Sequence, residues 1–417
     1  MKWNRRPFVE IAQFPPKIKL EKGKEYSFIP MEDVNGGEKY ASPKYKRQYT
    51  GGGAKFGEGD TLFARITPCL ENGKIAQAKN LIGGKGFGST EYFVFRGIKD
   101  VSDSDFIYYL SKTYFFWQNA VNSMVGASGR QRADAKFLSK VMVPYPPLGA
   151  QREIASILSA YDDLIENNLK RIELLEELAQ ITYEEWFVTR MINGNQIKDS
   201  DIETLRMEEL VSDYMNGGWG KEEVEGNYTE QAYVIRGTDM PDISFGNFSG
   251  LPLRFHTKSN LKPRRLKPGD ISIEMSNGNI GNVGRSFFFD GSLETALSIP
   301  IMCASFCKML RPKSLELGYI IDLHLKYIHR TDTMLVYKSQ GANGINNFRF
   351  EDMIADEELF IPQNEYYELF VEPIKNIYNL ISNLRIQISL LKEARDLLLP
   401  RLMTGMIDVE KTTTETT

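Results

Sequence analysis

The stretch GDTLFARITPCLENGK, residues 59–74, brings together side chains that could do acid–base, nucleophilic and anion-binding chemistry. Asp60 and Glu71 are candidate proton carriers, and Cys69 is a candidate nucleophile. Arg65 and Lys74 add positive charge within the same stretch. Such a density of functional groups is typical of an active site, but a polar scaffold would look the same.

The pattern of the stretch predicts a β-hairpin. Residues 61–66 alternate with the period of a strand, and Pro68 ends that strand. Asn72-Gly73 predicts a tight turn before a second strand over residues 75–78. Asp60 follows a glycine at the start of the first strand, where a carboxylate accepts hydrogen bonds from the backbone. We therefore interpret Asp60 as structural.

Signatures of catalysis are missing from the rest of the sequence. No G-x-x-x-x-G-K-[ST] loop occurs. The tetrapeptide PYPP at 144–147 lacks the asparagine of the Asn-Pro-Pro-aromatic motif of adenine methyltransferases, and PGDISIEMS lacks the lysine of a metal-dependent nuclease. Cys303 and Cys307 could hold a metal, but no second ligand pair follows. We predict no catalytic residue, no metal and no cofactor.

Length and composition favour an intracellular globular protein. The 417 residues, of which 42% are hydrophobic, suffice for two or three domains. The sequence has 3 cysteines, too few for a disulfide framework, so we expect a reducing cytoplasm. Neither a membrane-spanning run nor a signal peptide is recognisable, and no membrane association is expected.

The charges are segregated along the chain, although the net charge is only −4. Residues 1–150 carry 23 Lys and Arg against 14 Asp and Glu, and residues 251–350 carry 14 against 7. Residues 151–250 carry 8 against 21, and residues 351–417 carry 6 against 13. Two basic blocks that could face nucleic acid therefore alternate with two acidic ones.

This alternation accompanies an internal repeat. GEGDTLFARI at 57–66 aligns with KPGDISIEMS at 267–276, and VGASGRQRADAKFLSKVMVPYPP from Val125 aligns with QGANGINNFRFEDMIADEELFIP from Gln340. DDLIENNLKRIELLEELA from Asp162 aligns with YNLISNLRIQISLLKEAR from Tyr378. The offset of about 210 to 218 residues is far beyond the period of a solenoid, so the chain is a duplicated unit.

Each repeat ends in a predicted long helix. Apolar residues recur every three or four positions, without an internal proline or glycine in the first helix. A simple amphipathic helix packed on its own domain would give one such stripe, but two in matching places favour an antiparallel coiled coil. The residues expected to pair the helices are Ile157, Leu164, Ile172 and Leu175 in the first, and Ile377, Ile381, Leu384, Ile388 and Leu391 in the second.

The aromatic run FIYYLSKTYFFWQNAV, from Phe106, has two readings. It could stack on nucleic-acid bases, because every base offers a flat face to an aromatic ring. At helical spacing, however, such a run more often forms a core. We predict that it is core.

These linked features resemble the specificity (S) subunit of type I restriction–modification systems. The carrying stretches are VPYPPLGAQREIASILSAYDDLIENNLKRIELLEELAQITYEEWF, LLKEARDLLLPRLMTGMIDV and GDISIEMSNGNIGNVGR. The resemblance covers nearly the whole chain. One departure is the second helix start, where IPQNEYYELFVEPI replaces the PPLGAQREIA form.

The resemblance implies an α+β fold with two similar mixed α/β target-recognition domains and an internal pseudo-twofold. The expected target-recognition domains are residues 1–150 and 196–365. Residues 151–195 and 366–407 would be helical spacers, and 408–417 a flexible tail. Each domain would read one half of a split site on double-stranded DNA. Two adenine methyltransferase (M) subunits and the restriction/translocase (R) subunits would supply all chemistry.

Candidate DNA contacts are cations for phosphate and side chains that can donate two hydrogen bonds to a base edge. In the first domain they are Lys44, Lys46, Arg47, Gln48, Tyr49, Arg130, Gln131 and Arg132. In the second they are Arg236, Arg254, Lys258, Arg264, Arg265, Asn277, Asn279, Asn343 and Asn346. Two alternatives stay open at this point: a coiled-coil scaffold that does not bind DNA, and the specificity module of a fused methyltransferase-nuclease.

Overall fold

The computed structural model describes residues 3–127, 129–192, 194–341, 344–363 and 365–409. The chain forms two compact units, which are treated separately below. Unit 1 comprises Met1–Glu166 and Leu391–Thr417, and unit 2 comprises Asn167–Leu390. Within the described ranges, no helix combines the length and apolar character needed to cross a membrane.

Unit 1 is built on two mixed sheets and a separate two-stranded sheet. In the larger sheet, β7 (Thr61–Ala64) and β8 (Ile75–Ala78) form an antiparallel pair, and β10 (Tyr92–Gly97) pairs antiparallel with β7. The sheet of five strands is β2 (Ala12–Gln13), β10 (Tyr92–Gly97), β7 (Thr61–Ala64), β8 (Ile75–Ala78) and β4 (Tyr40–Ala41). The sheet of four is β5 (Tyr45–Gln48), β3 (Glu25–Ile29), β9 (Lys85–Gly88) and β6 (Ala54–Gly57), and β1 (Asn4–Pro7) pairs with β11 (Met142–Tyr145). The hairpin predicted around residues 61–78 is thus present.

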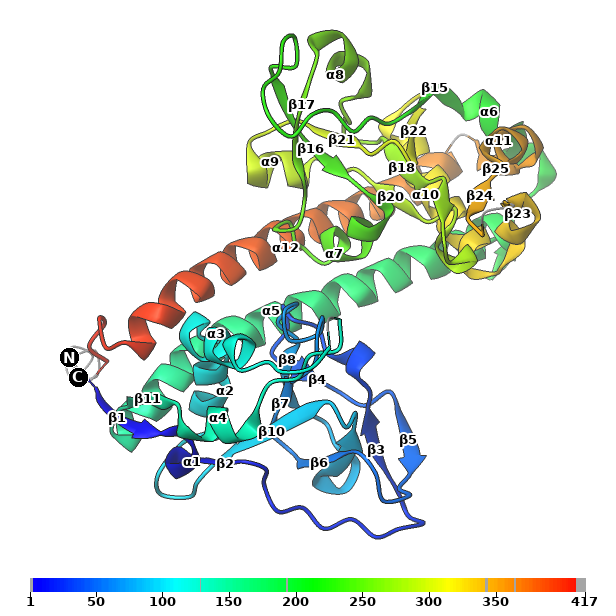
Figure 1. Cartoon of the computed structure of the whole chain (residues 1–417). Helices are drawn as coiled ribbons and strands as arrows, with labels where there is room; N and C mark the ends of the chain where they lie inside the picture. Colours follow the sequence, from blue (N-terminus) through cyan, green and yellow to red (C-terminus); the bar gives the residue numbers. More distant parts are fainter. Residues whose placement is uncertain (1–2, 128, 193, 342–343, 364, 410–417) are drawn as a thin grey trace, which may run out of the picture. The chain divides into compact units, whose positions relative to one another are not determined.

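The helices of unit 1 cover the larger sheet. They are α1 (Phe8–Ile11), α2 (Ser104–Lys112), α3 (Tyr114–Asn122), α4 (Ala135–Lys140) and the first half of α5 (Leu148–Tyr183). The carboxylate of Asp103 caps α2 by accepting the backbone N–H groups of Asp105 and Phe106 at 3.0 Å. Figure 1 shows α2 between the sheet and α5.

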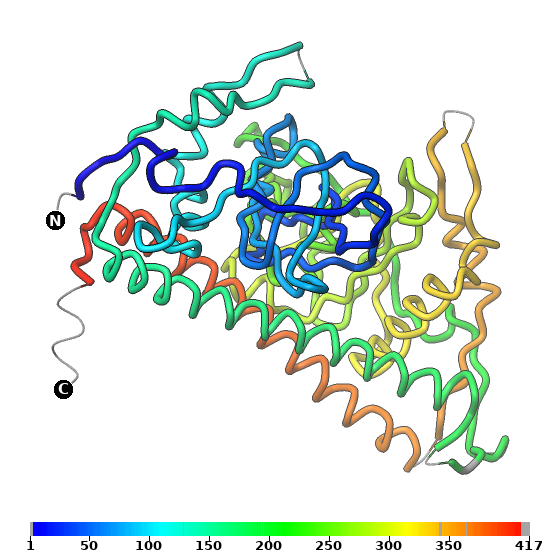
Figure 2. The backbone as a smooth tube through the Cα atoms, turned by 90° about the horizontal axis from the view of Figure 1, so that it is seen from below, coloured from blue at the N-terminus to red at the C-terminus, as the bar shows by residue number. Residues whose placement is uncertain are grey.

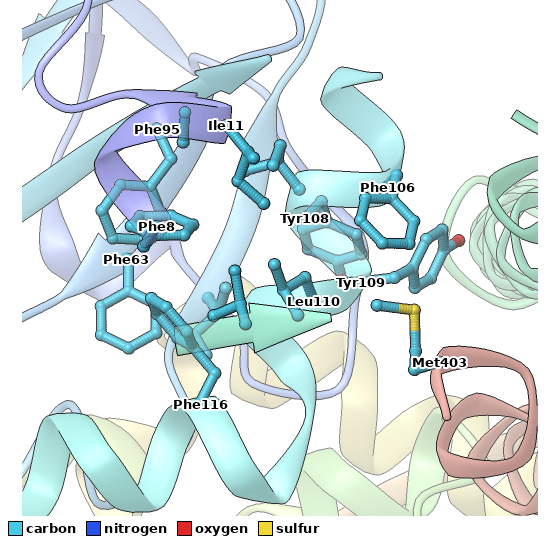
Figure 3. Close-up of a cluster of buried hydrophobic side chains, with 14 of the residues drawn as sticks. Phe8, Ile11, Phe63, Phe95, Phe106, Tyr108, Tyr109, Leu110, Phe116 and Met403 are labelled. Atoms are coloured by element: carbon cyan, nitrogen blue, oxygen red, sulfur yellow. The ribbon is translucent and has the colours of Figure 1, made fainter. Parts of the chain in front are cut away.

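The core of unit 1 is rich in aromatic rings (Figure 3). Phe8 lies 5.0 Å from Phe95 and 4.7 Å from Phe116, measured between ring centroids. Phe106 is fully buried in the same cluster, and Met403 closes it from the C-terminal end of α12 (Glu365–Met403). The aromatic run from Phe106 is therefore mainly core, as the helical spacing indicates.

Unit 2 contains smaller sheets. A sheet of four has the order β15 (Val211–Asn216), β22 (Cys307–Pro312), β18 (Ile271–Glu274) and β20 (Ser286–Phe288). Two sheets of three are β17 (Leu253–His256), β16 (Glu230–Ile235) and β21 (Ile301–Cys303), and β19 (Ser276–Asn277), β24 (Asn346–Phe348) and β23 (Lys338–Gln340). Two further sheets have two strands each: β14 (Ile202–Arg206) with β25 (Glu358–Pro362), and β12 (Met191–Ile192) with β13 (Asn195–Gln196).

Unit 2 repeats the strand-then-capped-helix order of unit 1. Its helices, apart from the halves of α5 and α12, are α6 (Met207–Leu210), α7 (Met240–Ser244), α8 (Lys258–Arg264), α9 (Ser292–Leu297), α10 (Leu315–Arg330) and α11 (Phe350–Asp356). Ser314 caps α10 directly after β22, as Asp103 caps α2 after β10. The core gathers around Met240, Phe289 and Met309.

The Gly-Asp motif has the same geometry in both units. Asp60, fully buried, accepts the backbone N–H of Gly57 at 2.7 Å and a two-point ion pair from Arg96 on β10. Asp270 accepts the backbone N–H of Lys267 at 2.7 Å and a two-point ion pair from Arg311 on β22. Asp60 therefore closes a turn and ties two strands together, which confirms its structural interpretation.

Polar contacts join the long helices inside unit 1. Arg395 of α12 donates from Nη1 to Oδ1 of Asp162 on α5 at 2.5 Å, and the Tyr109 hydroxyl of α2 donates to the other carboxylate oxygen at 2.5 Å. Both charged side chains are more than 90% buried. The late part of α12 thus packs on the early part of α5 and on the domain core.

Inside unit 2 the early part of α12 packs on the late part of α5. Asn168 donates to the Oε1 of Gln387 at 3.3 Å. Arg385, 6% exposed, forms ion pairs with Glu176 of α5 at 3.3 Å and with Asp290 of the domain at 3.0 Å. The helices are therefore antiparallel, which confirms the predicted pairing, and each runs without a break (Figure 2).

The buried stripe of α5 is shifted from the predicted one. Leu158, Ile165, Ile172 and Ala179 are buried at intervals of seven residues, as in a coiled coil. Leu164 was expected at the helix interface and is 51% exposed, because its neighbour Ile165 takes the inward position. The α-helix ends at Tyr183 and continues only as a π-helical turn to Val188, short of the expected residue 195.

The other residues expected to pair the helices are buried or partly buried. Ile157 and Leu175 are partly buried on α5. On α12, Leu391 is partly buried, and the remaining four are less than 10% exposed: Ile377, Ile381, Leu384 and Ile388.

Candidate nucleic-acid interface

Strand β5 presents cations at an edge of the smaller sheet of unit 1. All four residues of β5 are exposed, since β3 covers only one of its sides. Lys44 pairs with Asp33 at 2.8 Å, and this carboxylate raises the pKa of Lys44. Arg47 lies over the ring of Phe28 at 4.9 Å. Among the described residues, the Lys46 ammonium has no ion-pair or hydrogen-bond partner, so it is available to an external anion.

The other two predicted contacts at this edge serve the domain. Gln48 is exposed, but its side-chain amide donates to the carbonyl of Gly23 at 3.0 Å. Tyr49 is only 3% exposed, and its ring packs 5.1 Å from that of Phe87, between centroids. Its position in the pleat turns the Tyr49 ring toward the interior of the domain.

The loop GASGRQR contains two arginines, Arg130 and Arg132, that differ in their contacts. Arg132 makes a two-point ion pair with Glu91 at 2.8 to 3.0 Å, which raises the pKa of Arg132. The backbone of Gln131 exchanges hydrogen bonds with Thr67, each at 3.0 Å. Arg130 is exposed, and its guanidinium has no hydrogen-bond or ion-pair partner among the described residues.

In unit 2, two of the predicted arginines are engaged within the domain. Arg236 forms a two-point ion pair with Asp239 at 2.6 and 2.9 Å. Arg254 pairs with Glu222 at 3.0 Å, and its guanidinium lies 4.6 Å from the centroid of the Trp219 ring. The Arg254 side chain is only 16% exposed, whereas that of Arg236 is 43% exposed.

The cations around α8 differ in their availability. Arg264 donates to the carbonyl of Asn216 at 3.1 Å, and Arg265 is paired with Glu294. Lys258 is exposed in the first turn of α8, with no side-chain partner among the residues that the structure describes. Lys258 therefore remains a candidate for phosphate contact.

The asparagines of the SNGN turn organise the turn itself. Asn277 donates to Glu274 at 2.7 Å, and its carbonyl oxygen accepts the backbone N–H of Asn279 at 2.7 Å. The Asn279 side chain accepts the backbone N–H of Gly281 at 3.0 Å. Asn279 is exposed and retains a free amide donor group.

Asn346, a predicted DNA contact, makes its hydrogen bonds within the domain. It is 6% exposed and donates to the carbonyls of Asn277 and Gly278 at 3.2 and 3.1 Å. These bonds fasten β24 to the SNGN turn, so the amide has no remaining donor for a base. Asn343 lies outside the described residues.

A row of lysines was missed by sequence reasoning. Lys17, Lys19 and Lys22 are exposed in the segment that leads into β3, and Lys22 lies beside Gly51, just after β5. The sequence signal was the basic run KIKLEKGK, which alternates cations with apolar residues. Lys22 and Lys46 both add exposed positive charge at the β5 side of this sheet, which suits a phosphate backbone.

Comparison with known proteins finds similarity to DNA specificity subunits. Residues 4–177 match the family model described as type I restriction modification DNA specificity domain. The type I restriction enzyme EcoAI specificity subunit of Escherichia coli is 29% identical over 187 residues, 43% of this chain and 32% of that subunit. The chain thus aligns with about a third of the EcoAI and EcoEI subunits.

A second relative aligns over nearly its full length. The type I restriction enzyme MjaIX specificity subunit of Methanocaldococcus jannaschii is 26% identical over 426 residues, 95% of this chain and 90% of that subunit. A crystal structure of the S subunit of a type I restriction-modification system from M. genitalium shares the fold, with a TM-score of 0.52, 15% identity and 96% of each chain covered. Over residues 4–177 the sequence is that of a type I restriction modification DNA specificity domain. Along nearly the whole chain, the fold is similar to that of an S subunit of a type I restriction-modification system.

Proposed function

We propose that this chain selects the DNA target of a type I restriction–modification complex by reading two separated half-sites. The observation that carries the proposal is the duplicated framework: each unit repeats the Gly-Asp turn, the arginine that locks it and the capped helix that follows. Residues 1–150 and 196–365 would be the two target-recognition domains, each with its own exposed cations.

The long helices would set the gap between the half-sites. Helix α5 has 36 residues and α12 has 39, so each is about 50 to 60 Å long. Half-sites read from one face of the duplex lie about 34 Å apart or a multiple of it. An antiparallel pair of helices with ion pairs at Asp162–Arg395, which is buried, and Glu176–Arg385, which is partly buried, can hold such a distance, whereas a flexible loop cannot.

Partner subunits would supply the chemistry. Two adenine methyltransferase subunits and the restriction subunits would act on the DNA, and this chain would be non-catalytic. The helices carry exposed apolar side chains that suit a protein partner. On α5 these include Leu174, Leu178 and Ile181, and on α12 they include Leu369, Leu380 and Leu390, all 46% to 59% exposed. The acidic surroundings of these residues would repel DNA and leave the helices to protein contacts.

Methylome sequencing tests the proposal. The chain is co-expressed with its cognate methyltransferase, and modified adenines are mapped in the host genome. We expect one split motif with a fixed gap, and exchange of residues 1–150 for those of another specificity subunit should change only one half. Methylation of an unbroken motif, or a change in both halves, would contradict the proposal.

A further inference from the structure

Two loops, one in each unit, share a Gly-x-x-Gly spacing. They are GASG at 126–129 and GANG at 341–344. The second glycine of each loop has a left-handed backbone, with φ of 77° at Gly129 and 79° at Gly344. A Cβ would meet no atom within 4 Å at either position, so the backbone conformation alone requires glycine.

The described residues that flank each loop pair antiparallel and form a two-stranded ribbon. Val125 and Arg132 exchange backbone hydrogen bonds of 3.0 Å in unit 1. Strands β23 and β24 pair Gln340 with Asn346 in unit 2. Figure 2 shows each ribbon leaving the body of its own unit. We name residues 124–127 and 129–133 the first ribbon and residues 338–341 and 344–348 the second ribbon.

The root of each ribbon is fastened to the segment that follows the Gly-Asp strand. Gln131, two positions after the second glycine, is bonded to Thr67 through its backbone. Asn346, at the matching position, is bonded through its side chain to the carbonyls of Asn277 and Gly278. The two ribbons are therefore held by the same part of the duplicated framework.

The position between the second glycine and this root differs chemically between the ribbons. It is Arg130 in the first ribbon, where the guanidinium is exposed while Arg132 is neutralised by Glu91. It is Ile345 in the second ribbon, with 42% of the side chain exposed. The two loops share a backbone geometry but expose different side chains at this position, as expected of elements that read different bases.

We propose that the two ribbons are base-reading elements and that Arg130 and Ile345 set one base preference in each half-site. This rests on the proposed function. A two-stranded ribbon fits the major groove of B-DNA. An arginine there pairs with the O6 and N7 of guanine, and an aliphatic side chain contacts the methyl group of thymine. The first ribbon would select guanine in one half-site, and the second ribbon thymine in the other.

The experiment maps methylation by complexes of the cognate methyltransferase with the wild-type chain, Arg130→Ala or Ile345→Ala. We expect Arg130→Ala to reduce discrimination at one guanine by about 10- to 100-fold and to leave the other half-site unchanged. Ile345→Ala should relax a thymine in the opposite half-site. The unchanged half-site shows in each case that the chain is folded and assembled.

The matched control is Lys136→Ala, which removes an exposed cation of α4 in the same unit and should not alter the motif. An unaltered motif with Arg130→Ala would overturn the ribbon proposal while leaving the proposed function intact. A uniform loss across all sequences would also overturn it, since that outcome identifies a phosphate contact. Failure of the wild-type complex to methylate any split motif would instead refute the proposed function.

Discussion

Arg96 on β10 donates from Nε and Nη2 to the two carboxylate oxygens of Asp60 at the start of β7, at 2.5 and 2.7 Å. Asp60 is fully buried, and burial raises its pKa against the opposing effect of Arg96 and the Gly57 backbone N–H. Asp60→Asn should therefore lower the free energy of unfolding by about 3 kcal/mol, because it leaves the partly buried Arg96 guanidinium without a carboxylate partner.

The control for this first prediction lies in the same stretch. Glu71→Gln changes an exposed carboxylate and should alter the free energy of unfolding by less than about 0.5 kcal/mol. Asp270→Asn, the equivalent change in unit 2, should be as damaging as Asp60→Asn. Urea unfolding of the three variants gives the comparison. A stable Asp60→Asn chain that had lost methylation activity in its complex would restore the active-site interpretation.

Adjacent residues of α5 should respond very differently to truncation. Ile165 is 2% exposed, whereas Leu164 is 51% exposed. Ile165→Ala should cost about 2 to 4 kcal/mol through lost burial and the cavity left behind, and Leu164→Ala less than about 0.5 kcal/mol. Denaturant unfolding of the two variants measures both values. Equal losses would mean that the helix faces are assigned incorrectly.

Asp60 could be predicted from the sequence, whereas the inward face of α5 could not. The hairpin strand over 75–78 and the structural Asp60 follow from local patterns: alternation, a proline stop and a glycine before an aspartate. The two long helices follow from periodicity. The inward residue of α5 does not, because Leu164 and Ile165 are both apolar and each follows an apolar residue, Ile157 or Leu158, by seven positions, so two phases of the same period fit the sequence.

The candidate interface was predicted less well, because pairing over long sequence distances decides which cations are free. Arg132 and Arg254 look equivalent to Arg130 in the sequence, but Glu91 and Glu222 neutralise them in the fold. Burial likewise makes Tyr49 unavailable at the surface, because the pleat of the sheet turns this polar aromatic residue inward. No local pattern reports either effect.

Lys112 should give unit 1 a stability that rises with pH. Burial lowers the pKa of Lys112 to about 8, and Arg395 and Lys392 lower it further while Asp162 and Asp396 oppose them. Between this pKa and the ordinary value of 10.5, the unfolded chain holds a proton that the folded chain has released. The free energy of unfolding therefore gains a positive slope with pH from Lys112.

The pH prediction is tested by comparing Lys112→Met with the wild-type chain between pH 7.5 and 9.5. The free energy of unfolding of the variant minus that of the wild type should fall as pH rises, because only the wild type gains from losing this proton. The slope is the readout, since loss of the hydrogen bond from Lys112 to the carbonyl of Gly36 shifts the curve without tilting it. A pH-independent difference would refute the lowered pKa.

Lys44 and Lys46 lie two residues apart at the β5 edge and should differ in their contribution to DNA binding. The ammonium of Lys44 is 2.8 Å from Asp33, whereas Lys46 has no side-chain partner among the described residues. If Lys46 contacts a phosphate, DNA binding releases a counterion there. Lys46→Ala should then reduce the slope of log affinity against log salt by about 1, with no change in sequence preference.

Lys44→Ala is the matched control, because Asp33 already neutralises much of its charge and fewer counterions are released on binding. Its effect on the slope should be clearly smaller than that of Lys46→Ala. Affinities are measured for the complex with the methyltransferase by fluorescence anisotropy between 50 and 200 mM salt, the range over which about six phosphate contacts change affinity by orders of magnitude. Equal effects of the two substitutions would show that the Asp33 pair opens on DNA, and no effect from Lys46→Ala would remove the β5 edge from the interface.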